Sequence, residues 1–487
     1  LYFFNPLKMG DKLILRGKVV DEQRRGGIMK DQLFLNPFSE GTEFINTNRF
    51  HLDLNYNLPL SSKTTLNLST AYVHHKRNAT NDTYLASYKE SHNDESPDVE
   101  MMRPYLAKEN SLTPSLTLTS RLGYHQITAG VQGFVTNLRE TGKYCIDDKD
   151  NTAYYGTSYT SIGKKKAHEI GAFIQDEWPN LLPGLTIVPG IRLNTHHSEE
   201  LYKSSEKVFD GNFPKTKFSK TVVLPRLALK FDVSKKLVLR ANIGTGFRAP
   251  YGFSEDLHLC SGSPRVWKSS NLKGEKSISY NLSADYYADR LQLSLNIFRT
   301  DLKDKIEFAA ADANVKKLGY TYQWENVDDG YVQGIELGAK FVLLRDLKAG
   351  LNWTFNQGEY KHQRSDWQGT PYAKDSKQIS RFPEMTGDLS LDYTPGTWTF
   401  TVESSLQGRM YIDYNAEDAA NSKIKRTPTF MLLNARVSKK IGKMFTLYAG
   451  GKNVLGYIQD ERHTDDAAFM YAPVTGAAFY AGVSLKL

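Results

Sequence analysis

The chain has 487 residues, of which 40% are hydrophobic and 12% aromatic, with 28 tyrosines. It is too polar for a bundle of transmembrane helices, since it has no run of about 18 apolar residues, and too aromatic for a disordered chain. The formal charge of +8 comes from 62 basic and 54 acidic residues that are intermixed along the sequence, which does not favour nucleic-acid binding.

Strict alternation of apolar and polar residues is the main local signal from the first third of the chain to its end. No linker or change of composition interrupts it, so residues 1–487 are expected to form a single domain. Alternation with a period of two indicates strands with one apolar and one polar face. A soluble β-sandwich and a membrane barrel both have such strands, so alternation alone leaves both classes open. The clearest examples are Phe50–Leu58, Ile278–Tyr286, Leu347–Phe355 and Phe479–Leu487.

The connections between these strands are alternately short and long, which favours the barrel. Bacterial outer-membrane barrels have tight turns at the periplasmic end and large loops outside the cell. The pattern therefore predicts an all-β, transmembrane, antiparallel barrel, with about 18 strands between Lys12 and Leu487. The short connections include Pro59–Lys63, Gly123–Gln126 and Thr394–Gly396, and the long ones His74–Glu109, His197–Lys217, Arg248–Glu275, Lys303–Gly330 and Glu359–Pro383.

Several segments resemble TonB-dependent outer-membrane receptors, and they occur in the order expected for that family. The most specific is the sequence LPRLALKFDVSKKLVLRANIGTGFRAPYGFSEDL, with its Phe-Arg-Ala-Pro element, followed by NLKGEKSISYNLSADYY. The resemblance covers essentially the whole chain. The matching segments are Leu224–Leu257, Asn271–Tyr287, Ile170–Trp178, Leu185–His196, Asn326–Phe341, Arg381–Pro395, Gly450–Gly456 and the C-terminal residues from Tyr471.

The resemblance implies a barrel of about 22 strands around a globular plug, preceded by an energy-coupling segment. The chain starts with LYFFNPLKMG, which reads as a beginning partway through a strand. We therefore expect roughly four strands, the plug and the coupling segment to be absent from this sequence, and to come from the same precursor or from a second fragment. Leu487 and Ala477 depart from the Phe and Arg that are frequent in the family.

The function implied by the resemblance is active import of a large, scarce nutrient across the outer membrane of a Gram-negative cell. The sequence FRAPYGFSEDLHL resembles receptors of Bacteroidetes-like bacteria, which places cobalamin ahead of haem and ferric siderophores as the metal chelate. The implied partners are the TonB–ExbB–ExbD complex, acting through the plug, outer-membrane lipid and a surface lipoprotein. The alternatives are a passive diffusion porin and a soluble or surface-exposed binding protein. No enzyme activity, resident cofactor or structural metal is expected.

Six residues in the predicted outer loops are candidates for ligand contact. Arg248 lies where a strand meets a loop, and it either pairs with a carboxylate or faces the ligand. His258 is either a ligand to a metal such as haem iron or a solvated loop residue, and the aromatic residues could form a platform over the lumen. Cys145 and Cys260 both fall in predicted outer loops, in an oxidising compartment where a disulfide between them could form. The candidates are Arg248, Tyr251, His258, Trp267, Tyr411 and Tyr414.

Overall fold

A computed structural model of the chain describes most of its residues. The described ranges are 2–4, 6–7, 10–27, 41–79, 88–95, 105–145, 149, 153–204, 215–250, 266–268, 271–310, 313, 322–364, 367–414, 423–459 and 470–486. Within these ranges, no helix has both the length and the apolar character needed to cross a membrane.

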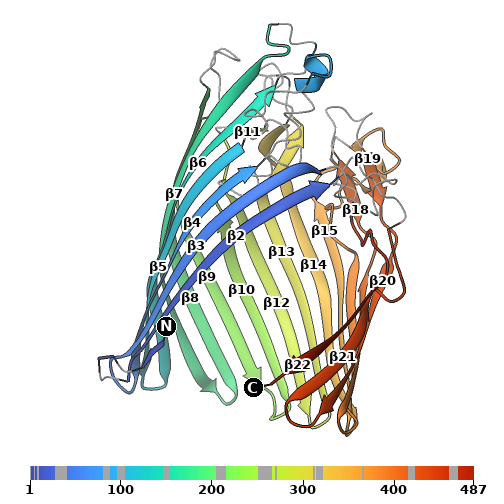
Figure 1. The fold of residues 1–487 in the computed structure, drawn as a ribbon. Helices are drawn as coiled ribbons and strands as arrows, with labels where there is room; N and C mark the ends of the chain where they lie inside the picture. Colours follow the sequence, from blue (N-terminus) through green and yellow to red (C-terminus); the bar gives the residue numbers. More distant parts are fainter. Residues whose placement is uncertain are drawn as a thin grey trace.

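The described residues form one antiparallel meander in which each long strand pairs with its neighbours along the chain (Figure 1). The long strands are β2 (Lys12–Gly27), β3 (Gly41–Pro59), β4 (Thr64–Ala79), β5 (Tyr105–Leu122), β6 (His125–Cys145), β7 (Ser158–Leu182), β8 (Leu185–Ser204), β9 (Lys215–Asp232), β10 (Leu237–Arg248), β12 (Glu275–Ala288), β13 (Leu291–Ala310), β14 (Tyr322–Leu344), β15 (Leu347–Tyr360), β16 (Met385–Tyr393), β17 (Trp398–Gln407), β20 (Phe430–Ile441), β21 (Phe445–Lys452) and β22 (Ala478–Leu485).

Four short strands complete the sheets. β1 (Tyr2–Phe4) pairs with β2, and β11 (Val266–Lys268) pairs in parallel with β14, so that the main sheet has 20 strands among the described residues. β18 (Tyr411–Tyr414) and β19 (Lys423–Arg426) form a separate two-stranded sheet. Figure 1 shows the main sheet wrapped around one axis; β2, with the short β1 paired at its start, forms one edge and β22 the other. No described pairing joins these edges, so the expected number of strands in a closed barrel stays a prediction.

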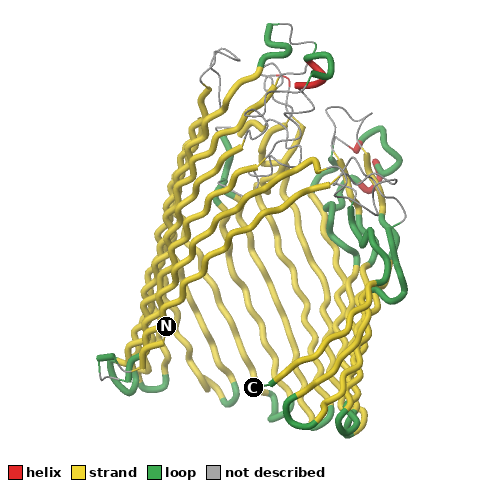
Figure 2. Tube along the Cα trace, viewed as in Figure 1, coloured by secondary structure: helices red, strands yellow, loops and turns green. Residues whose placement is uncertain are grey.

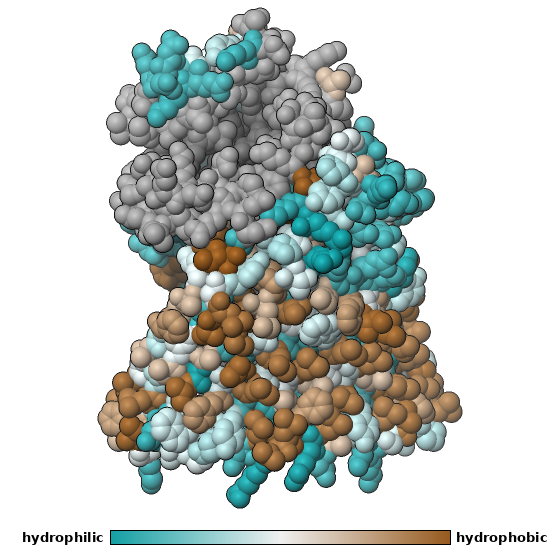
Figure 3. Space-filling view, turned by 90° about the vertical axis from the view of Figure 1, so that its right-hand side faces the viewer, coloured by the Kyte–Doolittle hydropathy of each residue, from teal (hydrophilic) through white to brown (hydrophobic). Residues whose placement is uncertain are grey.

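The two faces of the sheet have opposite character, as the alternation predicts. Leu282, Ile297, Ile335 and Phe355 are partners across β12, β13, β14 and β15, and between 42% and 56% of each is exposed on the outer face. Figure 3 shows, on the face in view, an apolar belt across the lower part of the molecule, with hydrophilic residues above and below it. One position along β12, Asn281 faces the interior and donates a hydrogen bond to Asn242, at 3.0 Å. Apolar groups facing outward are what a lipid environment requires.

The two ends of the sheet differ, and we call them the turn end and the loop end. At the turn end, tight turns join successive strands (Figure 2). Gly184 lies in one of these turns with a φ of +80°, where a Cβ would come within 2.7 Å of the carbonyl oxygen of Asp232. The sequence therefore needs glycine there. Turns at Pro59, Gly123 and Gly396 lie where they were predicted.

At the loop end the strands continue further than predicted. β8 runs to Ser204, whereas a loop was expected from His197, and β13 and β14 extend to Ala310 and back to Tyr322, within the expected loop Lys303–Gly330. These loop boundaries were wrong because apolar alternation lasts only as long as one face meets lipid. A strand needs about 9–11 residues to cross the membrane, whereas β7 has 25. Above the belt both faces are polar, and the pattern that identifies a strand disappears.

Candidate functional site

Arg248 ends β10 at the loop end and ties three strands together. Its Nη2 donates to Glu275 Oε2 and to the carbonyl oxygen of Ile306, both at 3.0 Å. Glu275 Oε2 also accepts the Ile306 N–H at 3.1 Å. The guanidinium therefore links β10, β12 and β13, yet 48% of the side chain is exposed. The ion pair with a carboxylate is one of the two arrangements expected from the sequence, and contact with a ligand stays a prediction.

Tyr411 is packed inside a cluster of aromatic side chains between β18 and the segment before β16. Its ring centroid lies 5.3 Å from that of Trp367 and 5.6 Å from that of Tyr372. The hydroxyl donates to Asp375 Oδ2 at 2.6 Å, and only 7% of the residue is exposed. Burial, together with the hydrogen bond to Asp375, raises the pKa of the Tyr411 phenol well above its usual value. In this arrangement Tyr411 holds the loop in place and does not present its ring as a platform.

Charged groups bind the same segment to the two-stranded sheet. Arg364 Nη1 lies 2.7 Å from Asp413 Oδ2, and Trp367 Nε1 donates to the same oxygen at 3.3 Å. Trp367 itself is completely buried. The described part of the loop that follows β15 is therefore fixed on β18 at the loop end.

The other candidates lie wholly or partly outside the described residues. This holds for Tyr251, His258 and Cys260, and for the side chains of Trp267, which is in β11, and Tyr414, which is in β18. Cys145 is buried, with Sγ 3.2 Å from Ser91 Oγ. Ligand contact by these residues, and the disulfide between Cys145 and Cys260, stay predictions.

The inner face of the sheet is polar along its length. Arg192 Nη1 donates to Gln132 Oε1 at 2.7 Å, and Asn296 Nδ2 donates to Glu336 Oε2 at 2.9 Å. Arg240 pairs with Asp285 on the same face. In the described part of the chain no group of three or more His, Cys, Asp or Glu side chains is placed to hold a metal ion. This wall can contact water, a polar ligand or another polar domain.

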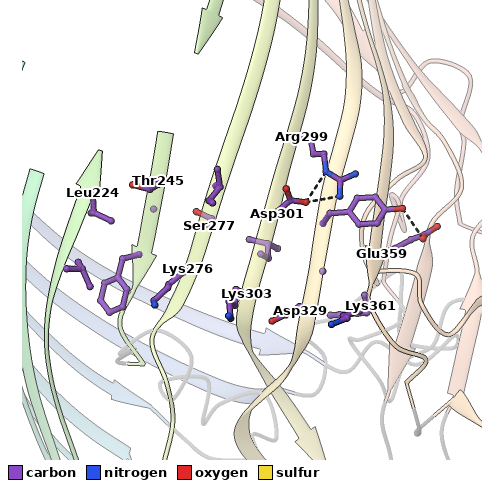
Figure 4. Close-up of a pocket in the computed structure, with 18 of the residues that line it drawn as sticks. Leu224, Thr245, Lys276, Ser277, Arg299, Asp301, Lys303, Asp329, Glu359 and Lys361 are labelled. Atoms are coloured by element: carbon purple, nitrogen blue, oxygen red, sulfur yellow. Dashed lines mark hydrogen bonds and ion pairs between the residues drawn. The ribbon is translucent and has the colours of Figure 1, made fainter. Parts of the chain in front are cut away.

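A cavity of about 840 Å³ at the loop end was not anticipated from the sequence. It extends from β9 across β10 and β12 to β15 (Figure 4). The ladder between β9 and β10 stops at the pair Arg226 and Gly244. Pro225, the next residue, has no N–H for the ladder, and the Thr245 hydroxyl donates to its carbonyl oxygen at 3.1 Å instead. Beyond this point the two strands are no longer paired, and the cavity begins.

A chain of hydrogen bonds crosses the outer face beside this cavity. Arg299 Nη2 lies 2.7 Å from Asp301 Oδ1, its Nη1 donates to Gln333 Oε1 at 2.8 Å, and its guanidinium lies 4.3 Å from the centre of the Tyr331 ring. Gln333 donates to Gln357 at 2.9 Å. The sequence signal that could have revealed this network is the replacement of apolar by polar residues at outward positions of β13 to β15.

The apolar outer face, polar inner face and tight turns at one end together define an outer-membrane β-barrel. Residues 21–454 match the family model described as TonB dependent receptor-like, beta-barrel. The chain therefore belongs to the TonB-dependent receptor family, as the resemblance of its segments indicated.

Individual relatives are distant. The chain is 24% identical over 376 residues to a ferric enterobactin receptor of Pseudomonas aeruginosa, covering 72% of this chain and 46% of that protein. It is 27% identical over 198 residues to the vitamin B12 transporter BtuB of Photobacterium profundum, covering 41% and 28% of the two chains. The siderophore receptor PiuA from Acinetobacter baumannii superposes with a TM-score of 0.69 at 15% identity, over 98% of this chain and 72% of that one, which shows a shared fold. The chain thus spans less than half the length of these two curated relatives.

Proposed function

We propose that this protein imports a metal chelate across the outer membrane by TonB-dependent active transport. The observation that carries the proposal is membership of the TonB-dependent receptor family over residues 21–454. The polar inner face of the barrel supports it, since a large hydrophilic ligand needs such a path. The family consists of receptors and transporters, so the protein acts by binding and moving its ligand.

The ligand first binds at the loop end. Arg248, whose side chain is partly exposed there, is a proposed contact, as are Tyr251, His258, Trp267 and Tyr414 in the surrounding loops. Tyr411 acts indirectly, because its buried ring and its bond to Asp375 keep the loop before β16 in place. A chelate with carboxylate or phosphate groups would suit the guanidinium of Arg248.

A plug domain, from the same precursor or from another fragment, is proposed to fill the polar interior. It would connect the barrel to the TonB–ExbB–ExbD complex, which supplies the energy for release of the ligand. A surface lipoprotein that delivers or covers the ligand is a further proposed partner.

Cobalamin is the preferred ligand, ahead of haem and ferric siderophores, on the resemblance of the sequence around His258. The relatives are consistent with chelates as a class, since they include ferric enterobactin receptors and vitamin B12 transporters.

Uptake in cells tests both the mechanism and the ligand. Cells that lack the gene are supplied with limiting cobalamin, haem or ferric enterobactin, with and without a functional TonB. We expect the wild-type gene to restore growth on limiting cobalamin only where TonB is intact. Restored growth on haem or ferric enterobactin alone would change the ligand but keep the mechanism. Uptake that is independent of TonB and rises linearly with concentration would identify a passive porin instead.

A further inference from the structure

The cavity at the loop end lies on the outer wall of the barrel, above the apolar belt. Strand register establishes this position. Ile278, Asp301, Tyr331 and Glu359 are partners across four adjacent strands, so their side chains share one face. Ile278 faces outward, with 40% of it exposed, as does Leu282 four residues along the same strand. The other three residues therefore also face outward, although all three are polar.

Outward side chains change character row by row from the belt towards the loop end. The row through Leu282 and Ile297 is apolar, and the next contains Arg299, Gln333 and Gln357. After the row through Asp301 comes a row that contains Lys276, paired with Lys303. Figure 4 shows these two lysines at one level with Asp329 and Lys361. Since each row is two residues further along the strands, about 7 Å, the lysines stand roughly 20 Å along the strands from the last apolar row.

The carboxylates around the cavity are already engaged. Asp301 is held by Arg299. Asp329 Oδ1 accepts the backbone N–H of Asp304 at 3.0 Å. Glu359 accepts hydrogen bonds from Tyr331 at 3.0 Å, Gln357 at 2.9 Å and Gln378 at 3.1 Å. Arg299 thus neutralises Asp301. Asp329 and Glu359 keep their negative charge, because their hydrogen bonds come from uncharged donors, and Lys377 partly offsets the charge of Glu359.

Basic groups nevertheless outnumber carboxylates in the lining of the cavity. Five lysines and Arg299 line it against Asp301, Asp329 and Glu359, so six positive and three negative groups give a formal charge of +3. Lys276, Lys303, Lys361 and Lys377 are exposed residues that line it. Within the described residues none of them forms an ion pair with a carboxylate at 4.0 Å or less. Four ammonium groups on one cavity wall favour a ligand with negative charge, and a compact anion such as phosphate suits lysine.

A second cavity, of about 770 Å³, adjoins the first on the side of the belt and shares Arg299 with it. Apolar outward side chains contribute to its lining, namely Leu282, Ile297, Ile335 and Phe355. A ligand that occupies both must be amphiphilic, with an anionic head and apolar chains. Gln333, Gln357 and Tyr331 lie between the two regions. Beyond the bonds already described, each amide has a second N–H and the Tyr331 hydroxyl has an acceptor lone pair, which can hydrogen-bond the hydroxyls of a sugar.

We propose that the outer wall of β12 to β15 binds a phosphorylated glycolipid of the outer leaflet. Its phosphate lies among Lys276, Lys303, Lys361 and Lys377, and its acyl chains lie along the apolar side chains of the second cavity. The wall faces lipid and the loop end faces the outside of the cell, so the occupant comes from the membrane and not from the solution. A bound glycolipid would hold the upper wall beside the unpaired part of β9 and β10. The site requires only that the chain is a barrel in the outer membrane, so its test is independent of transport.

The test uses the delipidated protein in detergent micelles, titrated with bis-phosphorylated lipid A and followed by native mass spectrometry. The variant carries K276Q, K303Q, K361Q and K377Q, which keep the side-chain length but remove the charge. The control carries K63Q, K235Q, K236Q and K443Q, which remove the same charge from exposed lysines at the turn end. The shift of the folded band on an unheated gel establishes that both variants are folded.

We expect the cavity variant to bind lipid A at least about tenfold more weakly than the wild type, since each lysine beside an anionic lipid contributes appreciably. The control should bind like the wild type, and lipid A without phosphates should bind weakly to all three proteins. Unchanged binding by the cavity variant would overturn the proposal. Equal binding of phosphatidylglycerol, or full competition by millimolar inorganic phosphate, would also overturn it, because either would remove the need for a glycolipid.

Discussion

At the scale of single residues, side chains chosen for ligand contact also hold the loop end together. Arg248 joins three strands through Glu275 and Ile306. Tyr411 is almost fully buried against Trp367. A residue that contacts a ligand and a residue that only holds a loop in place can look the same in sequence, because both are polar or aromatic residues next to a loop.

The role of Tyr411 in stabilising the loop end can be tested by removing its hydroxyl. Tyr411→Phe removes the hydrogen bond to Asp375, and a bond to a charged acceptor contributes about 1.5 to 3 kcal/mol. We expect faster hydrogen exchange of the β18 amides, because local opening becomes easier. Tyr372→Phe is the matched control, since the described structure gives its hydroxyl no hydrogen-bond partner. Equal exchange rates in the two variants would mean that the bond to Asp375 does not stabilise this loop.

At the scale of elements, strand direction and facing follow from alternation, whereas strand length does not. The lipid-facing part of each strand has a strict period of two. The turns at Gly123, Gly184 and Gly396 separate successive strands where the sequence predicted them. Beyond the belt the pairing continues through backbone hydrogen bonds, which are independent of side-chain polarity. The alternation of side chains therefore underestimates the length of these strands.

Cysteine labelling tests the facing of the strands. After Cys145 and Cys260 are replaced by serine, single cysteines are introduced at Leu52, Leu282 and Leu351, and at Asn55, Ser283 and Asn352. A lipid-soluble maleimide should modify the first three, which face lipid, and spare the second three, which face the interior. Labelling of the second set in place of the first would require the opposite facing and would rule out the barrel as described.

At the scale of the whole molecule, the sheet has two edges, one formed by β1 and β2 and the other by β22, and no described pairing joins them. An edge in lipid leaves backbone groups without partners, each at a cost of several kcal/mol. We therefore expect the two edges to be satisfied in the membrane, either by each other or by further strands.

The orientation of the molecule is tested with epitope tags at two exposed glycines. Gly369 lies in the loop between β15 and β16, and Gly396 lies in a turn at the opposite end; a Cβ at either would meet no atom within 4 Å. An antibody should reach a tag at Gly369 on intact cells, and a tag at Gly396 only after permeabilisation. The reverse result would mean that the loop end faces the periplasm, and the outer-leaflet glycolipid could then not occupy the cavity.

The sequence by itself determined that the strands have one apolar and one polar face, since this follows from neighbours along one strand. The alternation of short and long connections then favoured a membrane barrel with the apolar face outward. Ordered segments such as Leu224–Leu257 and Asn271–Tyr287 also indicated the family. Only the tertiary structure showed that Lys276, Lys303 and Lys361 line one cavity above the belt. Only it showed that Asp375 accepts a hydrogen bond from the Tyr411 hydroxyl. Their proximity depends on register between strands that are distant in sequence. Register is set by the length of every turn and by shifts such as the one between Lys305 and Ile306, which no local pattern encodes.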